Sequence, residues 1–322
     1  MNLLGFHHLT AVTADVKANH DFYTRTLGLR LVKKTVNQDD TSAYHLFYAD
    51  GVATPGTDIT FFDWPVLPER RGSGTVTRTG FRVETDAALQ YWHDRFSELK
   101  HLPGPITDVT GRPAFDVEDR EGQRLSVVLD PTAVASHPWA GATVPAEHQL
   151  RGLGPITMSV ANLAPTARTL TTLMNLQEVR TYTGPATDGT KNKTAAVHVF
   201  APEGNTSGAA AELHVAVEPE SPRGRGGSGS VHHVAFRVGS FEQYDAWAER
   251  LREFGVASSG PVDRFYFRSL YFREPGGVLF ELASDEPGFA ADEPMETLGQ
   301  KLALPPFLEG QRASIEAGLK AF

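Results

Sequence analysis

Apolar and polar residues alternate along this chain in short runs separated by turns. Near the amino end, the period-two alternation typical of half-buried strands marks residues 5–12, 30–36, 42–49 and 58–62. Between the first two runs, apolar residues from 16 to 27 recur at the spacing of an amphipathic helix. The pattern therefore predicts a strand, a helix and then three shorter strands.

The same unit recurs later in the chain. Residues 72–83 and 227–238 share Gly-Ser-Gly, a following Val, and a closing Phe, Arg and Val at matching positions. A weaker copy starts at 155–160. The last copy ends in two predicted strands, 267–272 and 278–283, joined by a Glu-Pro-Gly-Gly turn. A repeat of this kind indicates several small units that bury their apolar faces together.

One position of the unit can be followed through the copies, because an aromatic residue stands fourteen positions after it in three of them. These aromatic residues are Phe22, Trp92 and Trp247. The repeat position itself is held in order by His8, Arg78, Pro155 and His233. Its spacings of 70, 77 and 78 residues are regular for a unit of this size.

Four units account for most of the 322 residues, more than one typical core requires. The predicted boundaries are 1–70, 71–145, 146–222 and 223–290, with a helix-containing tail at 291–322. Segments rich in glycine, proline and serine, among them 70–74 and 221–230, indicate flexible connectors between units.

The amino-acid composition excludes several classes of function. A net charge of −9 and a pI near 5.7 argue against nucleic acid as a partner. No apolar run is long enough to cross a bilayer and no leader precedes residue 8, so we expect a cytoplasmic protein with no membrane partner. The absence of cysteine excludes thiolate chemistry, so any metal must be held by nitrogen and oxygen.

Two histidine pairs stand at corresponding places in the first and last copies. His7-His8 and His232-His233 each begin an alternating run, and Glu281 lies in the last strand between apolar neighbours. Strand alternation turns this carboxylate away from those neighbours, and adjacent histidines face opposite ways. One histidine of each pair, together with Glu281, could therefore surround a single metal ion.

The units also carry sequence marks of a known family. The marks occur at Gly5–Thr10, Asp21–Tyr23, Leu27–Asn37, Tyr44–Tyr48, Thr54–Thr57 and Leu302–Leu319. With these marks the chain resembles the vicinal oxygen chelate superfamily of glyoxalases, extradiol dioxygenases and some antibiotic-binding proteins. Within it, the set is most similar to the hydroquinone-type ring-cleaving dioxygenase branch.

The resemblance implies an α+β fold of four βαβββ modules that form two half-open barrel domains. Catechol-type members take their histidines from the third and fourth modules, but Pro155 cannot bind a metal. We therefore expect modules 1 and 4 to pair around the metal, and modules 2 and 3 to pair without one. A contact between subunits is the alternative, and assembly into a homo-oligomer stays open.

The resemblance also implies the site. The expected ligands are His8, His233 and Glu281, with His7 and His232 donating hydrogen bonds to them from behind. Two histidines and a carboxylate leave about three positions of an octahedral ion open, as in non-haem Fe(II) oxygenases. Mn(II), which favours similar ligands, is the alternative ion. The expected partners are a small aromatic para-diol and O2.

Three further residues are assigned by the same resemblance. Arg264 and Tyr271 match the pocket arginine and tyrosine that orient the substrate and transfer protons. Thr10 shares a strand face with His8 and is expected to line the pocket.

Two other functions remain alternatives. A metal-dependent glyoxalase-like isomerase or lyase needs a second carboxylate at the position of Thr60, and Asp58 or Asp63 could supply it only with a shifted register. A protein that only binds and sequesters aromatic compounds needs a pocket but no metal.

Overall fold

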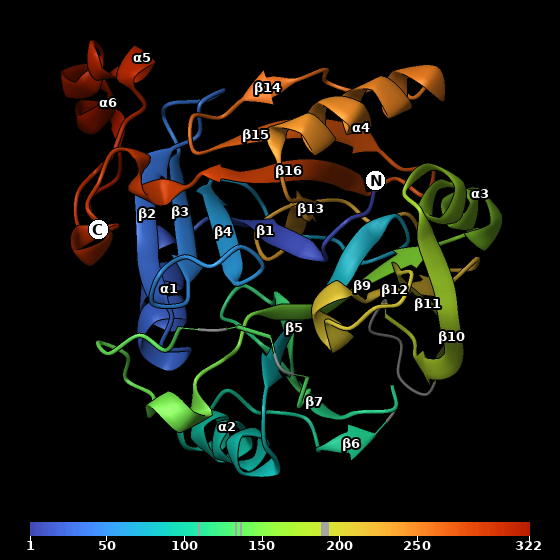
Figure 1. Ribbon diagram of the computed structural model, residues 1–322. Helices are drawn as coiled ribbons and strands as arrows, with labels where there is room; N and C mark the ends of the chain where they lie inside the picture. The colour runs from blue at the N-terminus through green and yellow to red at the C-terminus, as the bar shows by residue number, and fades with distance from the viewer. Residues whose placement is uncertain (109, 133, 136, 188–192) are drawn as a thin grey trace.

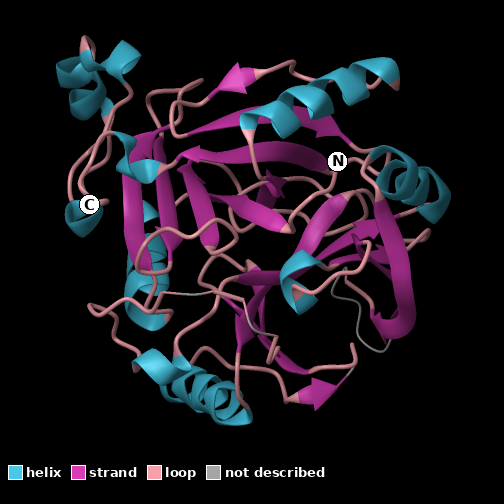
Figure 2. Ribbon diagram, in the orientation of Figure 1, coloured by secondary structure: helices cyan, strands magenta, loops and turns pink. Residues whose placement is uncertain are grey.

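The computed structural model describes residues 1–108, 110–132, 134–135, 137–187 and 193–322. Two curled sheets of eight strands dominate it, and short helices lie along their outer sides (Figures 1 and 2). The first sheet contains, in spatial order, β14 (Val262–Asp263), β15 (Phe267–Arg273), β16 (Leu279–Pro287), β13 (Val231–Val238), β1 (Phe6–Thr13), β4 (Asp58–Asp63), β3 (Tyr44–Ala49) and β2 (Arg30–Val36).

The second sheet has the same layout. In spatial order it contains β10 (Leu176–Pro185), β11 (Thr194–Pro202), β12 (Leu213–Val217), β9 (Leu153–Val160), β5 (Thr75–Val83), β8 (Arg124–Leu129), β7 (Pro113–Glu118) and β6 (Thr107–Asp108). The first sheet therefore joins strands from the two ends of the chain, and the second joins strands from its middle. This arrangement confirms the α+β fold of two half-barrels.

Each unit carries one helix after its first strand. These helices are α1 (Val16–Asp21), α2 (Asp86–Glu98), α3 (Leu163–Arg168) and α4 (Phe241–Glu253). A polar side chain caps the start of each, namely Asp15, Thr85, Asn162 and Ser240. The helix expected at 16–27 is not uniform, because after α1 the chain continues as a wider π-helical turn, Phe22–Thr26.

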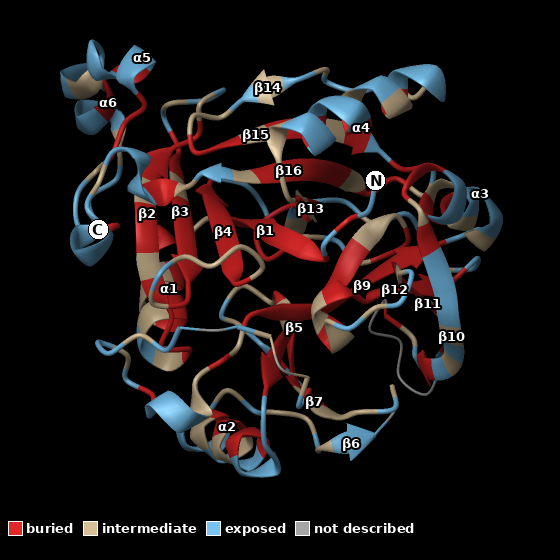
Figure 3. Cartoon of the chain, in the orientation of Figure 1, coloured by how far each residue is buried: buried red, intermediate tan, exposed pale blue. Residues whose placement is uncertain are grey.

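The aromatic residue that marks the repeat is a core residue. Phe22 is 3% exposed, and Trp92 and Trp247 are fully buried where their helices cover the sheets. In Figure 3 the buried positions run along the strands and the inner helix faces. The repeat is therefore maintained by packing, which explains why a large aromatic residue recurs at a fixed offset from the first strand.

The connectors expected to be flexible are instead ordered against each other. Isolated bridges join Pro68 to Ser228, Arg70 to Arg225 and Ser73 to Arg223. The prediction of flexible tethers at 70–74 and 221–230 was wrong, because each segment supplies the backbone partners that the other lacks.

The carboxyl-terminal tail packs on the outer strand β2. Short helices α5 (Pro306–Glu309) and α6 (Arg312–Gly318) place Leu304, Leu308 and Ile315 against Val36. The fully buried Lys33 ammonium contacts Asp292 at 2.7 Å and also Glu293. Within the part of the chain that the structure describes, no helix has the length and apolar character needed to span a membrane.

Candidate metal centre

Strand register brings the two ends of the chain into one site. β1 and β13 run antiparallel, with Thr10 opposite His233 and Ala235 opposite His8. β13 runs parallel to β16, where Ala235 lies opposite Glu281. The side chains of His8, His233 and Glu281 therefore project from three neighbouring strands toward the concave side of the first sheet.

The three side chains meet at their polar ends. The Nε2 atoms of His8 and His233 lie 3.3 Å apart, and they lie 3.2 and 2.8 Å from Glu281 Oε2. Their potential ligand atoms all fall within 4.8 Å of one another. All three residues are buried, with exposures of 1%, 3% and 0%. This is the spacing expected when three groups converge on one ion.

The state of Glu281 tests whether a metal fits. Its Oε1 accepts a 2.5 Å hydrogen bond from Ser269 Oγ, whereas its buried Oε2 has no well-aligned donor among the described residues and has only the two imidazoles beside it, His233 Nε2 at 2.8 Å and His8 Nε2 at 3.2 Å. Burial alone would raise the pKa of this carboxyl, but the facing imidazoles of His8 and His233 hold the pKa well below its usual range. A buried anionic oxygen without a well-aligned hydrogen-bond donor is stabilised by a cation, so the residues fit a divalent metal.

The second histidine of each pair supports its neighbour. His7 Nδ1 lies 2.8 Å from His8 Nδ1, and His232 Nδ1 lies 2.8 Å from His233 Nδ1. Burial and the adjacent imidazole lower the pKa of His7 and of His232 to about 3, so both stay neutral. Each can then accept the Nδ1 proton of its neighbour, the reverse of the donation expected from the sequence, and this leaves the facing Nε2 lone pair free for a metal.

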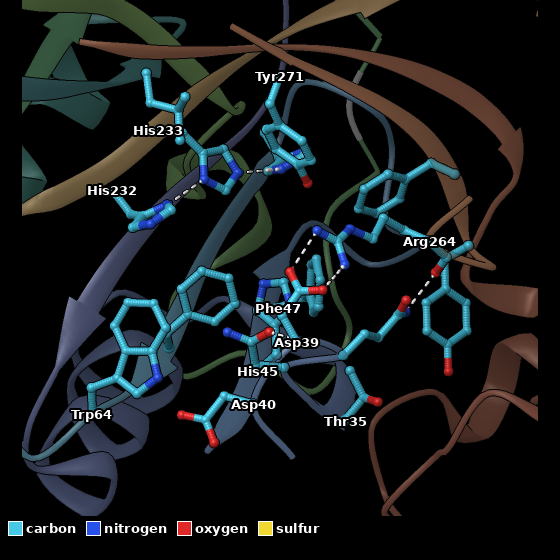
Figure 4. Close-up of a pocket in the computed structure, with 17 residues that line it drawn as sticks. Thr35, Asp39, Asp40, His45, Phe47, Trp64, His232, His233, Arg264 and Tyr271 are labelled. Atoms are coloured by element: carbon cyan, nitrogen blue, oxygen red, sulfur yellow. Dashed lines mark hydrogen bonds and ion pairs between the residues drawn. The ribbon is translucent and has the colours of Figure 1, made fainter. Parts of the chain in front are cut away.

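A cavity of about 350 Å³ adjoins these groups (Figure 4). His8 and His233 form part of its wall, and the remainder combines aromatic side chains with polar ones from residues 35–40 and Arg264. The aromatic residues are Phe47, Phe62, Trp64, Tyr266, Phe267 and Tyr271. Its size and lining suit one substituted aromatic ring next to the metal position.

Arg264 and Tyr271 line this cavity together. The Tyr271 ring lies 5.6 Å from the His233 ring, and the Arg264 guanidinium lies 5.5 Å from the centre of the Tyr271 ring. Arg264 also donates two hydrogen bonds to Asp39, at 3.0 and 2.8 Å. Burial raises the pKa of Tyr271, so its phenol keeps its proton at neutral pH.

Thr10 has a different place from the one expected. It is fully buried and accepts a 2.8 Å hydrogen bond from Thr60, and it is not among the residues that line the cavity. Thr60 lies opposite Thr10 in β4, as Glu281 lies opposite Ala235 in β16. The position where a fourth, carboxylate ligand would stand therefore holds a hydroxyl.

Sequence reasoning missed three polar residues around the centre. Ser269 orients Glu281, Asp39 holds Arg264, and His45 lines the cavity from β3. Ser269 had a usable signal, because it lies two positions before Tyr271 on one strand face. Asp39 had none, since its contact with Arg264 joins residues far apart in the chain.

Comparison with known proteins supports this description. The sequence profile of the Glyoxalase/Bleomycin resistance protein/Dioxygenase superfamily matches residues 5–127 and 152–282. A Bacillus subtilis protein named as a ring-cleaving dioxygenase, MhqA, is 43% identical over 322 residues, covering 99% of both chains. The chlorohydroquinone/hydroquinone 1,2-dioxygenase of Sphingobium indicum is 30% identical over 320 residues, covering 95% of this chain and 92% of its own.

Solved structures agree with the fold. A crystal structure titled as a dioxygenase from Bacillus subtilis superimposes with a TM-score of 0.88 at 33% identity, covering 100% of this chain and 98% of that chain. Glyoxalase I from Zea mays superimposes with a TM-score of 0.59 at 13% identity, covering 87% and 92%. The second likeness concerns the fold alone.

Proposed function

Because the chain belongs to the Glyoxalase/Bleomycin resistance protein/Dioxygenase superfamily, we propose that it is an Fe(II)-dependent dioxygenase that uses O2 to cleave the ring of a hydroquinone. The observation that carries the proposal is the buried cluster of His8, His233 and Glu281, in which one carboxylate oxygen faces both imidazoles. Two histidines and a carboxylate are the ligand set of non-haem Fe(II) oxygenases. The full-length similarity to the hydroquinone dioxygenase of Sphingobium indicum supports the same substrate class.

When bound, iron would supply sites for a phenolate oxygen and O2 and would lower the pKa of the coordinated hydroxyl. The protein side chains have separate tasks. Phe47, Phe62 and Phe267 form apolar walls that hold an aromatic ring and exclude bulk water. His7 and His232 fix the orientation of the ligand imidazoles.

Tyr271 and Arg264 are proposed to stabilise the negative charge that develops on the substrate oxygen during the reaction. The Tyr271 phenol stays protonated because burial raises its pKa, so it can donate a hydrogen bond or a proton to an oxygen that gains negative charge. The Arg264 guanidinium stabilises that charge from behind the tyrosine ring. Asp39 holds the guanidinium in place.

Oxygen uptake tests the proposal. Protein reconstituted anaerobically with Fe(II) should consume one O2 for each hydroquinone, and 18O2 should place both labelled atoms in the ring-opened product. An apo sample and a sample loaded with Mn(II) serve as comparisons for the choice of metal. No uptake with any para-diol, or undiminished uptake after His8→Ala, would overturn it.

The two rival functions fit the site less well. A glyoxalase-like isomerase needs a second carboxylate in the first unit, and Thr60 occupies that position. A protein that only binds aromatic compounds has no use for a buried carboxylate facing two imidazoles, because the uncompensated charge costs stability. The labelling experiment separates the dioxygenase from both rivals, since neither rival incorporates oxygen.

A further inference from the structure

His45 lines the same cavity as His8 and His233. It projects from β3, and its ring lies between Phe47 and Phe62, with ring centres 4.0 and 4.4 Å away (Figure 4). Two aromatic neighbours fix the plane of the imidazole, so its ring nitrogens have defined directions. A polar ring held this firmly between two aromatic side chains is expected to have hydrogen-bond partners.

The pseudo-symmetry of the first sheet gives His45 a counterpart. Phe47 lies opposite Thr60 in the β3–β4 pair, as Tyr271 lies opposite Glu281 in the β15–β16 pair. Two positions earlier on each strand stand His45 and Ser269. Ser269 donates a hydrogen bond to the candidate metal ligand Glu281, whereas His45 is hydrogen-bonded to Thr60. The same position therefore has a different task in each unit.

The hydrogen bonds set the tautomer of His45. Its Nε2 lies 2.9 Å from Thr60 Oγ1, and Thr60 donates its own proton to Thr10 at 2.8 Å. With Thr60 donating to Thr10, Nε2 carries the proton and donates it to Thr60. Burial holds the pKa of His45 well below its usual range, so the ring is neutral. Nδ1 is left as an acceptor, with no hydrogen bond to any residue in the described ranges.

Strand spacing leaves room for a ring between the metal and His45. β4 separates β3 from β1, so the two strands lie roughly 10 Å apart at about 4.8 Å per step. A para-diol bound to the metal through one oxygen points its second hydroxyl away from the metal. We propose that His45 Nδ1 accepts the hydrogen bond of this second hydroxyl and so selects para-diols over monophenols and their ethers. The inference rests on the proposed function.

Several other polar groups at the cavity already have hydrogen-bond partners, although the buried Thr35 Oγ1 has none among the described residues. Gln38 donates to the carbonyl oxygen of Arg264 at 2.8 Å, and Asp39 accepts from the Arg264 guanidinium. Asn37 Oδ1 accepts from the backbone N–H of Asp39, and Asp40 accepts from Ser42. His45 is therefore the better-placed acceptor for an incoming hydroxyl.

Binding of phenols to the Fe(II)-loaded protein, measured without oxygen so that no turnover occurs, tests the role of His45. Calorimetry would compare hydroquinone with 4-methoxyphenol, whose second oxygen cannot donate a proton. The wild type should prefer hydroquinone by about tenfold, the size of one hydrogen bond of roughly 1.4 kcal/mol. His45→Phe and His45→Leu should bind both ligands equally, and His45→Gln should restore part of the preference. His93→Phe, on α2 of the other half, is the matched control and should keep all of it.

The outcomes separate the two proposals. A wild type that binds hydroquinone but shows no preference, or a full preference in both His45→Phe and His45→Leu, would overturn the role of His45 alone. Failure of the wild type to bind either phenol would overturn the proposed function as well. Bound iron measured in each variant shows that the metal centre is intact.

Discussion

The two halves of this molecule share one strand layout but hold different chemistry. Register places four residues at equivalent positions, one from each unit. They are Thr60 and Glu281 in the first sheet and Ser126 and His214 in the second. Likewise, the repeat position holds His8 and His233 in the first half and Arg78 and Pro155 in the second. A few side chains therefore decide whether the concave face can hold a metal.

In the second half, arginines satisfy the buried carboxylate. Glu212 accepts two hydrogen bonds from Arg112, at 2.8 and 3.0 Å, and two from Arg180, at 2.8 and 2.7 Å. His214 Nε2 lies 3.2 Å from the same carboxylate, and Arg78 contacts Asp116 at 2.7 Å. The adjoining cavity is about 180 Å³, half that of the metal side.

The contrast between the two carboxylates is informative. Glu212 has two cationic partners inside the fold, so its charge needs nothing from outside. Glu281 has a neutral serine on one oxygen and facing imidazoles near the other. Arginine side chains thus neutralise Glu212, whereas the proposed metal ion would supply the positive charge at Glu281.

Removing the negative charge of Glu281 should have the largest effect on iron binding and activity. Glu281→Gln keeps the shape but loses the anionic oxygen, so bound iron and turnover should both fall by at least about 100-fold, the upper range for outer-sphere changes alone. Metal analysis and oxygen uptake measure the two. Ser126→Ala, at the equivalent position of the second half, is the control and should retain both. An equal loss of iron and turnover in the two variants would contradict the assignment of metal binding to the first half alone.

The matching change in the second half should act on stability instead. Glu212→Gln leaves Arg112 and Arg180 without their carboxylate and should lower the free energy of unfolding by about 3 kcal/mol. We choose the low end of the range because these arginine side chains are 20% and 31% exposed. Urea unfolding of the apo proteins measures it. Loss of iron binding at 25 °C in the folded variant would show that the halves are coupled.

The hydrogen bond behind Glu281 should matter less than the ligand itself. Ser269→Ala removes the donor to Oε1 and frees the carboxylate to rotate. Iron affinity should fall by about 10- to 100-fold, the usual cost of losing an outer-sphere partner. Competition with a chelator measures the affinity. An unchanged affinity would mean that neighbouring strands alone orient the carboxylate.

The smallest effect is expected at the cavity mouth. Asp39→Asn weakens the pair that holds Arg264, but the Asp39 side chain is 72% exposed. Exposed pairs contribute up to about 1 kcal/mol, so kcat/KM should fall by no more than about fivefold. Steady-state kinetics at low and high salt measures this. A change beyond about 100-fold would place Asp39 in the chemistry itself.

Much of the fold could be predicted from the sequence because the units repeat. The Gly-Ser-Gly and Phe-Arg-Val positions marked the first strand of the second and fourth units, and the buried Phe22, Trp92 and Trp247 marked the helix of three units. Local alternation also placed Glu281 on one strand face. These features depend on neighbours in the chain, which is where sequence patterns are informative.

The residues that were missed depend on contacts between distant segments. His45 reaches the cavity because β3 lies two strands from β1, and Asp39 meets Arg264 across the mouth. Thr10 was expected in the cavity but lies behind it, bonded to Thr60. Such details follow from sheet order and curvature, which no local pattern encodes.

Locating iron directly tests the central claim. Crystals of the protein loaded anaerobically with Fe(II) would be measured at the iron absorption edge. The account predicts one anomalous peak per chain, bounded by His8 Nε2, His233 Nε2 and Glu281 Oε2, and none beside Arg78 and His214. A peak elsewhere, or none between these three residues at full loading, would contradict it.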